Sequence, residues 1–309
     1  MNHKRLVLLG LLLAVSTTAG AVLAQRGRQR DRGGGDDYGG IDGRHGVPMW
    51  ENDERFKNDV FTFARVIYSS SRSYDNDFGG FGGFGGGGRR GRGGGGRGGG
   101  SWRVDYPQAD LNFSFRLQQL TTMKVNPNPV ALRLTDEELF DYPFLYMVEV
   151  GDGDIFLSEP EVVALRRYLL NGGFLMVDDF WGDYAWEVFY TQIKKVFPDR
   201  EPQDLDIDHE IFRCVYKLKE FPQVPSFLST DESLLARGIT WERRGPGCET
   251  PHFRALFDDK GRMMAIFCHN TDLGDGWERE GTSEFYFHNF SENKSYPMGI
   301  NIVTYALTH

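Results

Sequence analysis

Polar side chains gather in two short stretches, each directly after an apolar run. Residues 261–277 read GRMMAIFCHNTDLGDGW, and residues 171–183 read NGGFLMVDDFWGD. An apolar run that breaks abruptly into polar residues is typical of a buried strand that brings functional side chains to the edge of a sheet. The two stretches therefore predict one functional site.

Carboxylate and imidazole groups define the chemistry of this predicted site. They can bind a divalent cation through oxygen and nitrogen, or act as general acid and base. The candidate catalytic residues are Asp178, Asp179, His269 and Asp272. The candidate ligand-binding residues are Glu149, Trp181, Asn270, Asp275, Trp277 and Arg116. There is no HExxH motif and no complete calcium loop, so a divalent metal is compatible with the residues but not specified, and the aspartates could instead cap helices and form turns.

Several candidate residues have a structural alternative. The indoles of Trp181 and Trp277 could stack on a sugar ring or fill the edge of a core. Arg116 could bind a carboxylate or phosphate, or form an internal ion pair. His209 could be a nitrogen ligand of a divalent ion, or lie in a turn with its side chain hydrogen-bonded.

Cys268 and His269 suggest a thiol–imidazole pair, but neighbouring residues of a strand point to opposite faces. Met264, Ile266 and Cys268 would share one face, with His269 on the other. A buried, unreactive Cys268 is the alternative. The three cysteines (Cys214, Cys248 and Cys268) lack metal-type spacing and do not predict a disulfide framework.

Strands that alternate with amphipathic helices are expected to position these residues. Strands are predicted at 61–68, 144–150 and 174–177, a further strand after Asp208-His209, and a hairpin that turns at 258–261. Helices are predicted near 111–120, after Thr135, after Ser158, after a cap at Asp183, and at 298–307.

This alternation predicts an α/β three-layer sandwich with a mostly parallel sheet and an appended antiparallel hairpin. Ligands of such sheets bind beyond the carboxyl ends of the strands. Glu149, Asp178, Asp179, His269 and Asp272 all follow strands on that side, which is why they are grouped into one site.

The first hundred residues have a different composition. Residues 1–24 are predicted to be a signal peptide and 25–55 a disordered linker, and 56–309 a single α/β domain with a disordered Gly/Arg-rich insertion at about 75–101. No later segment is apolar enough to span a membrane. Residues 1–100 hold 15 Lys/Arg against 10 Asp/Glu (+5) and residues 101–309 hold 20 against 34 (−14), which gives the net charge of −9. The acidic domain argues against a nucleic-acid partner.

Five segments closely resemble the bacterial family called domain of unknown function 4159. They are DYPQADLNFSFRLQQLT, LFDYPFLYMVEV, NGGFLMVDDFWGD, CHNTDLGDGWE and YPMGINIVTYALTH. The resemblance spans roughly 61–309 and implies a fold similar to the class I glutamine amidotransferase-like (flavodoxin-like) sandwich, in exported or envelope-associated proteins. It implies no activity. Amidotransferases carry a Gly-x-Cys-x-Gly turn after a strand, where this chain has Asp178-Asp179-Phe180, so glutaminase chemistry is not expected.

The sequence leaves three functions open. The first is an exported ligand-binding domain, periplasmic, envelope-associated or secreted, without amidotransferase activity, for a small molecule or glycan. The second is a metal-dependent or carboxylate-based hydrolase acting on carbohydrate or an amide. The third is a structural or assembly role in the envelope. Convergence of Asp178, His269 and Asp272 in one concavity would favour the first two.

Overall fold

The computed structural model describes residues 43–56, 59–69, 101–151 and 155–309. The predicted signal peptide and nearly all of the predicted Gly/Arg-rich insertion lie outside these residues. Residues 43–55, which the sequence assigns to a linker, contact the α/β unit: Arg44 donates to Asn128 Oδ1 at 2.9 Å, and Trp50 Nε1 donates to the carbonyl of Val125 at 2.7 Å. None of the helices in the described part of the chain is long and apolar enough to cross a membrane.

The described residues form a seven-stranded sheet in the order β2-β1-β3-β4-β7-β6-β5. The strands β2, β1, β3, β4 and β7 are parallel to one another. At one edge of the sheet, β6 pairs antiparallel with β7, and β5 pairs antiparallel with β6. The predicted mostly parallel sheet with an antiparallel hairpin is confirmed. In chain order the strands are β1 (Ala64–Ile67), β2 (Val130–Arg133), β3 (Phe144–Val148), β4 (Phe174–Phe180), β5 (Gln203–Asp204), β6 (His252–Phe257) and β7 (Met263–His269).

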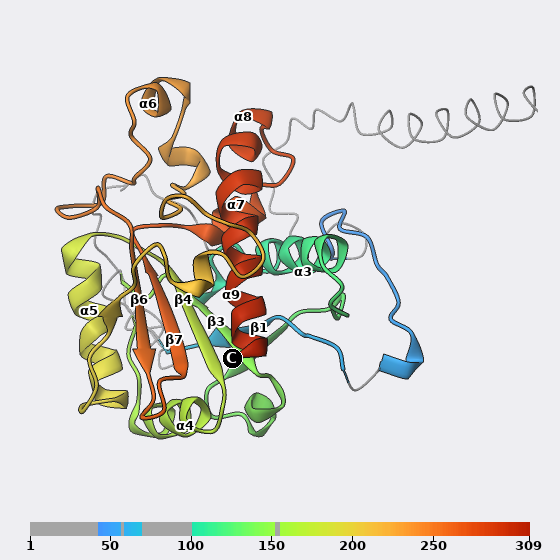
Figure 1. The fold of residues 1–309 in the computed structure, drawn as a ribbon, viewed down its shortest axis with the longest axis vertical. Helices are drawn as coiled ribbons and strands as arrows, with labels where there is room; N and C mark the ends of the chain where they lie inside the picture. The colour runs from blue at the N-terminus through green and yellow to red at the C-terminus, as the bar shows by residue number, and fades with distance from the viewer. Residues whose placement is uncertain (1–42, 57–58, 70–100, 152–154) are drawn as a thin grey trace, which may run out of the picture. The chain divides into compact units, whose positions relative to one another are not determined.

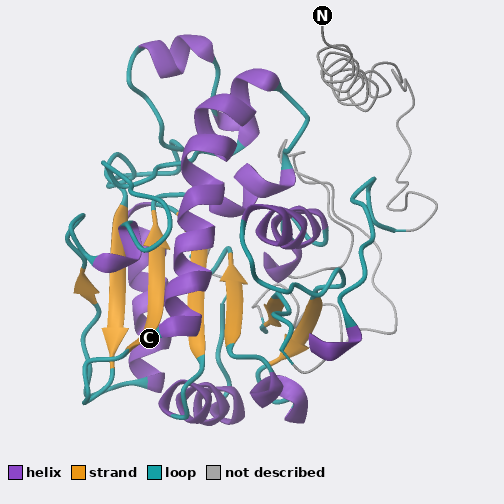
Figure 2. Ribbon diagram, turned by 45° about the vertical axis from the view of Figure 1, so that its right-hand side comes forward, coloured by secondary structure: helices purple, strands orange, loops and turns teal. Residues whose placement is uncertain are grey.

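Helices cover both faces of the sheet and make three layers (Figures 1 and 2). One face packs against α3 (Gln108–Leu120), α7 (Leu273–Glu278) and α9 (Tyr296–Thr308), and the other against α4 (Glu159–Leu170) and α5 (Gly182–Val196). The short helices are η1 (Glu54–Phe56), η2 (Ser101–Arg103), η3 (Glu137–Asp141), η4 (Glu210–Phe212), η5 (Phe227–Ser229), α6 (Glu232–Ala236), α8 (Glu284–Tyr286) and the π-helix η6 (Phe287–Ser295). Figure 1 shows α6 and α8 at the end of the molecule opposite to α4.

Local sequence signals account for several of these boundaries. Ser158 and Glu161 form the predicted capping box at the start of α4, which satisfies backbone N–H groups that the first turn leaves unpaired. The helix ends before Gly172, whose φ of +104° is a conformation that only glycine adopts without strain. The hairpin at 258–261 joins β6 to β7 as predicted, and the C-terminal helix is also confirmed.

Three local predictions are wrong, and a fourth, the short helix expected after Thr135, is present in a 3-10 form. No strand follows Asp208-His209: His209 Nδ1 instead accepts from the amide of Ile211 at 3.2 Å and caps η4, which agrees with the expected hydrogen-bonded turn. Asp183 lies in the first turn of α5 rather than at its cap. The helix expected after Thr135 is only the 3-10 helix η3. Met264 packs on the face opposite to Ile266 and Cys268, because a register shift interrupts the alternation near the start of β7.

Candidate functional site: a carboxyl cluster at the edge of the sheet

The carboxyl ends of three adjacent parallel strands share an unusual backbone conformation. Glu149 after β3, Asp179 in β4 and Asn270 after β7 have positive φ values of 55°, 54° and 62°. Non-glycine residues in this region cost of order 1–3 kcal/mol each, and they concentrate at functional sites. The strain therefore marks this edge of the sheet as a candidate site.

The left-handed turn at Asp179 coincides with a register shift between Val177 and Phe180, where β4 pairs with β7. In a regular strand the side chains of Asp178 and Asp179 would point to opposite faces. Here both carboxyls reach the first turn of α7: Asp178 accepts from the amide of Gly274, and Asp179 lies beside Asp272, which caps that helix. Both aspartates lie within β4, not after it as the sequence predicted.

Three buried carboxyls, which we call the inner trio, lie against one another. Asp179, Glu242 and Asp272 are 1%, 2% and 3% exposed, and one oxygen from each lies within 4.8 Å of the other two. Hydrogen bonds fix the trio. Trp181 Nε1 donates to Asp179 Oδ1 at 3.0 Å, the amide of Ser226 to Glu242 Oε1 at 2.8 Å, and the amide of Asp275 to Asp272 Oδ1 at 2.7 Å.

A second set, the outer trio, adjoins the first. It consists of Asp105, Asp275 and Glu278, again with one oxygen of each within 4.8 Å of the others. Asp105 also has a positive φ, of 62°. A Cβ at position 274 would lie 2.7 Å from Tyr146 Oη and 3.0 Å from Asp105 Oδ2. Glycine is thus needed at this position for the start of α7 to come so close to the carboxyls.

Asp178 lies next to both trios, and we call the two trios together with Asp178 the carboxyl cluster. Its Oδ2 accepts from Tyr146 Oη at 3.1 Å and from the amide of Gly274 at 3.0 Å. Its Oδ1 is buried and has no hydrogen-bond partner among the described residues. Burial, and then the charge of Asp179, raise the pKa of Asp178 well above its ordinary value.

Four other carboxyls of the cluster, those of Asp179, Glu278, Asp105 and Asp272, are also difficult to ionise. Burial, and then the neighbouring Glu242, raise the pKa of Asp179 to about 7. Burial likewise raises the pKa of Glu278 to about 7 and holds those of Asp105 and Asp272 well above the usual range, with neighbouring carboxylates adding to the effect. Like charges in a poorly solvated site disfavour ionisation.

Two arginines compensate part of this negative charge. Arg244 pairs with Glu242 at 2.7 Å and with Glu149 at 3.5 Å. Arg279 pairs with Asp275 at 3.1 Å and with Glu278 at 2.7 Å. The carboxyls outnumber these cations, so the cluster must hold protons or bind additional positive charge.

The sequence-predicted residues divide into two groups. The structure brings together Asp178, Asp179, Asp272 and Asp275, and the Arg244 ion pair connects Glu149 to them. His269 is not part of this group. Its ring stacks on Phe180 on the α5 side, its Nε2 lies 3.0 Å from the carbonyl of Gly182, and its Nδ1 lies 3.1 Å from Arg254. Burial lowers the pKa of His269 to about 4, so the imidazole is neutral at physiological pH.

The remaining candidates have structural contacts. Trp277 is fully buried, with its ring centroid 4.4 Å from that of Phe113, and Trp181 is 4% exposed and holds Asp179. Arg116 forms an ion pair with Glu280. The Asn270 amide donates to the carbonyls of Gly247 and Thr250 at 2.7 Å each.

Cys268 is fully buried, and burial raises the pKa of its thiol. The three cysteines are free. A thiol with a raised pKa is mostly protonated at neutral pH, and the thiolate is the nucleophilic form.

Sequence reasoning missed Asp105, Glu242, Arg244 and Glu278. Glu242 and Arg244 belong to the segment WERRGPG, which has no helical or strand periodicity. The only local signal is the pair of arginines beside an acidic residue and a tryptophan. Their position depends on how the loop after α6 folds over the sheet edge.

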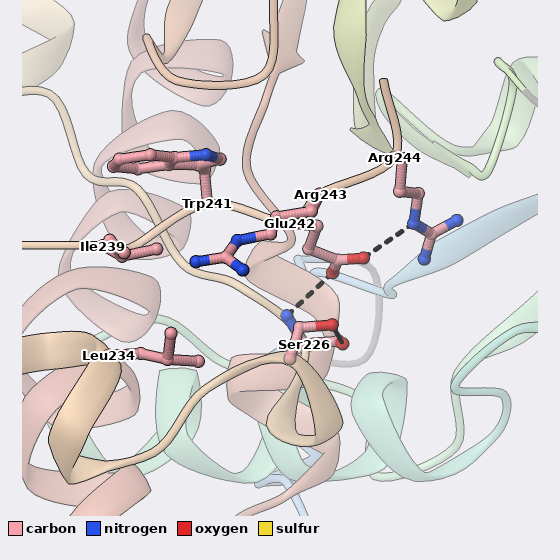
Figure 3. Close-up of a pocket in the computed structure, with 8 residues that line it drawn as sticks. Ser226, Leu234, Ile239, Trp241, Glu242, Arg243 and Arg244 are labelled. Atoms are coloured by element: carbon pink, nitrogen blue, oxygen red, sulfur yellow. Dashed lines mark hydrogen bonds and ion pairs between the residues drawn. The ribbon is translucent and has the colours of Figure 1, made fainter. Parts of the chain in front are cut away.

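A pocket of about 400 Å³ adjoins the inner trio (Figure 3). It is lined by Ser226, Ser229, Leu234, Ile239, Trp241, Glu242, Arg243 and Arg244. Glu242 belongs to both the pocket and the inner trio, so a molecule in the pocket would lie next to the carboxyls.

Fold and site together define an α/β domain with a carboxyl-rich site at the carboxyl edge of a mostly parallel sheet. The chain belongs to the family described as domain of unknown function (DUF4159), whose sequence profile matches residues 94–307. This confirms the family resemblance found in the sequence. No curated protein matches the chain.

Proposed function

We propose that this domain binds a divalent cation at the inner trio and that the cation helps to bind a small molecule or glycan. The observation that carries this proposal is the spacing of Asp179, Glu242 and Asp272. Calcium binds oxygen at about 2.3–2.6 Å, so two oxygens on one ion are at most about 5 Å apart. One oxygen from each member of the trio lies within 4.8 Å of the other two, so a single ion can contact all three residues.

The ligand types favour a hard cation. The trio offers carboxylate oxygen only, which suits calcium, magnesium or manganese better than zinc or copper. The hydrogen bonds from Trp181, Ser226 and the amide of Asp275 hold the three carboxyls in place before an ion arrives. The second oxygen of Glu242 also pairs with Arg244 at 2.7 Å, so an ion shares this oxygen with the guanidinium or displaces it. A bound cation would also relieve the repulsion that raises the pKa of Asp179.

Thermal unfolding of protein freed of metal by chelation tests this proposal. Calcium, magnesium or manganese at about 100 times its Kd should add about 2.7 kcal/mol of stability. At about 2–4 °C per kcal/mol, the Tm should rise by about 5–10 °C. Asp179→Asn and Asp272→Asn should remove this rise, whereas Asp259→Asn, at an 88% exposed side chain, should keep it.

An unchanged Tm with all three cations would contradict the proposal. Unfolding of both variants, with no cation effect in the parent protein, would point instead to a structural or assembly role for the domain.

We also propose that the fold is of the class I glutamine amidotransferase-like or flavodoxin-like type. In chain order, the parallel strands are arranged 2-1-3-4-5, counting β7 as the fifth, which is the flavodoxin-like order. Amidotransferase activity is not part of the proposal. Asp178-Asp179-Phe180 stands where those enzymes carry their nucleophile turn, and Cys268 is fully buried within β7.

A cation-dependent hydrolase of carbohydrate or an amide is the second candidate. It is favoured by the pocket that shares Glu242 with the inner trio, because a substrate there would lie beside the cation. A bound cation can polarise a substrate oxygen or activate water. Chromogenic glycosides and amides, tested with and without calcium, should be cleaved by the parent protein and not by Asp179→Asn if this candidate is right.

We propose further that residues 1–24 direct export, so that the domain acts in the periplasm, at the envelope or outside the cell. The charged start, the apolar run at 6–15 and the small residues before position 25 support this proposal. N-terminal sequencing of the mature protein from a bacterial host tests it, with cleavage near position 24 expected and an intact Met1 contradicting it.

A further inference from the structure

The pocket beside the inner trio combines an apolar wall with a positive charge. Figure 3 shows the guanidinium of Arg243 on the same side of the pocket as Trp241, Ile239 and Leu234. Arg243 is exposed and has no ion pair or hydrogen bond to its side chain among the described residues. An arginine without an acidic partner beside an indole can bind a carboxylate while the ring covers an apolar surface.

The acidic residue of the pocket does not neutralise Arg243. Glu242 Oε1 accepts from the amide of Ser226 at 2.8 Å, and its Oε2 pairs with Arg244 at 2.7 Å. Two hydroxyls, of Ser226 and Ser229, lie 2.9 Å apart on another part of the lining. The pocket therefore offers one guanidinium, one indole face and two hydroxyls, in a volume of about 400 Å³ that lies within the range of ligand sites.

We infer that this pocket binds a carboxylate-bearing sugar, such as a hexuronate unit of an acidic glycan. Arg243 pairs with the sugar carboxylate, the indole of Trp241 packs against the C–H face of the ring, and Ser226 and Ser229 hydrogen-bond to its hydroxyls. This inference deepens the proposed function and rests on it, because the cation at the inner trio lies next to the same pocket through Glu242. A carboxylate fits better than a neutral sugar because it can accept two parallel, charge-assisted hydrogen bonds from the Arg243 guanidinium, which a sugar hydroxyl cannot.

Calorimetric titration with digalacturonate tests this inference in calcium-loaded protein. The parent protein should bind digalacturonate, and Arg243→Gln and Trp241→Ala should each weaken binding at least about tenfold, which corresponds to about 1.4 kcal/mol. Arg237→Gln is the matched control, because Arg237 is an exposed arginine near α6 that does not line the pocket. It should bind as the parent does.

Three results would overturn the inference: equal binding of neutral cellobiose, unchanged binding by Arg243→Gln, or preference for inorganic phosphate or benzoate over digalacturonate. The outcome is separable from the cation proposal. A calcium-induced rise in Tm without digalacturonate binding rejects the sugar alone. If digalacturonate binding depends on Arg243 but is unchanged by chelation, the result supports the inferred sugar site and rejects the role of the cation in binding.

Discussion

Asp178 is the residue whose ionisation the fold opposes most clearly. It is 0% exposed, and one of its oxygens has no partner among the described residues. Burial raises its pKa well above the ordinary value. In the metal-free protein the raised pKa means that the folded state is favoured while Asp178 is protonated. This stabilisation is fully present below the ordinary pKa of about 3.9, and it is lost as the pH rises toward the folded-state pKa.

Asp178→Asn should therefore remove a pH-dependent loss of stability. In the presence of chelator, the free energy of unfolding of the variant, relative to that of the parent protein, should increase by up to about 1.4 kcal/mol per pH unit as the pH rises from about 5 to about 8. Urea unfolding at the two pH values measures this. Asp259→Asn, at an exposed carboxyl, should show no such gain. An equal difference between Asp178→Asn and the parent at both pH values would contradict the prediction.

Sequence reasoning at the residue scale found the carboxyls that follow an apolar run. Asp178, Asp179, Asp272 and Asp275 belong to stretches where burial gives way to polarity, and the structure groups them. His269 was grouped with them in error, because β7 continues through this residue and its alternation turns the imidazole toward α5. Glu242 was missed because a loop without periodicity carries it.

At the scale of elements, a fully buried ion pair joins β1 to α3. Arg65 and Asp110 are both 0% exposed, and Arg65 Nε lies 3.0 Å from Asp110 Oδ2. Arg65 also donates to the carbonyls of Trp102 and Val104, and so holds the segment that leads to Asp105. Removing one partner leaves the other charge buried, which costs about 3–5 kcal/mol.

Arg65→Ala and Asp110→Ala should each lower the free energy of unfolding by about 3–5 kcal/mol. The double variant Arg65→Met, Asp110→Leu should lower it by less than the sum of these two losses. Chemical denaturation of the three variants measures this. Strict additivity of the losses would contradict the ion-pair account. Arg116→Ala is the comparison, since Arg116 is 28% exposed in its own pair with Glu280 and should cost less.

The longest helices (α3, α4, α5 and α9) and five of the seven strands were predictable because local signals mark their ends. The capping box of α4, the hairpin turn at 258–261 and the apolar run of β7 each fix an element from its own residues. The strand β2 and the short helices α6, α7 and α8 were not predicted. Nor were the two-residue strand β5 and the helix η4. Their conformation depends on the neighbouring β6 and α9, and no periodic pattern of their own specifies it.

At the scale of the whole molecule, protons and the cation compete for the same carboxyls. The pKa of Asp179 is raised to about 7 and that of Asp272 well above normal. At about pH 5 these groups are protonated in the metal-free fold, and a cation must displace the protons to bind. The calcium-induced rise in Tm should therefore be larger at about pH 8 than at about pH 5.

Differential scanning calorimetry with calcium and with chelator at both pH values measures this competition. Asp272→Asn should remove the rise at both pH values. A calcium effect of equal size at the two pH values would mean that surface carboxylates, which are ionised at both, bind the ion instead of the cluster.

The most direct test of the central claim is a crystal structure of the calcium-loaded protein. The account predicts one ion bonded to carboxyl oxygens of Asp179, Glu242 and Asp272 at about 2.3–2.6 Å. Calcium bound only at other carboxylates, or the three carboxyls left without an ion in crystals whose protein shows the calcium-dependent rise in Tm, would contradict it.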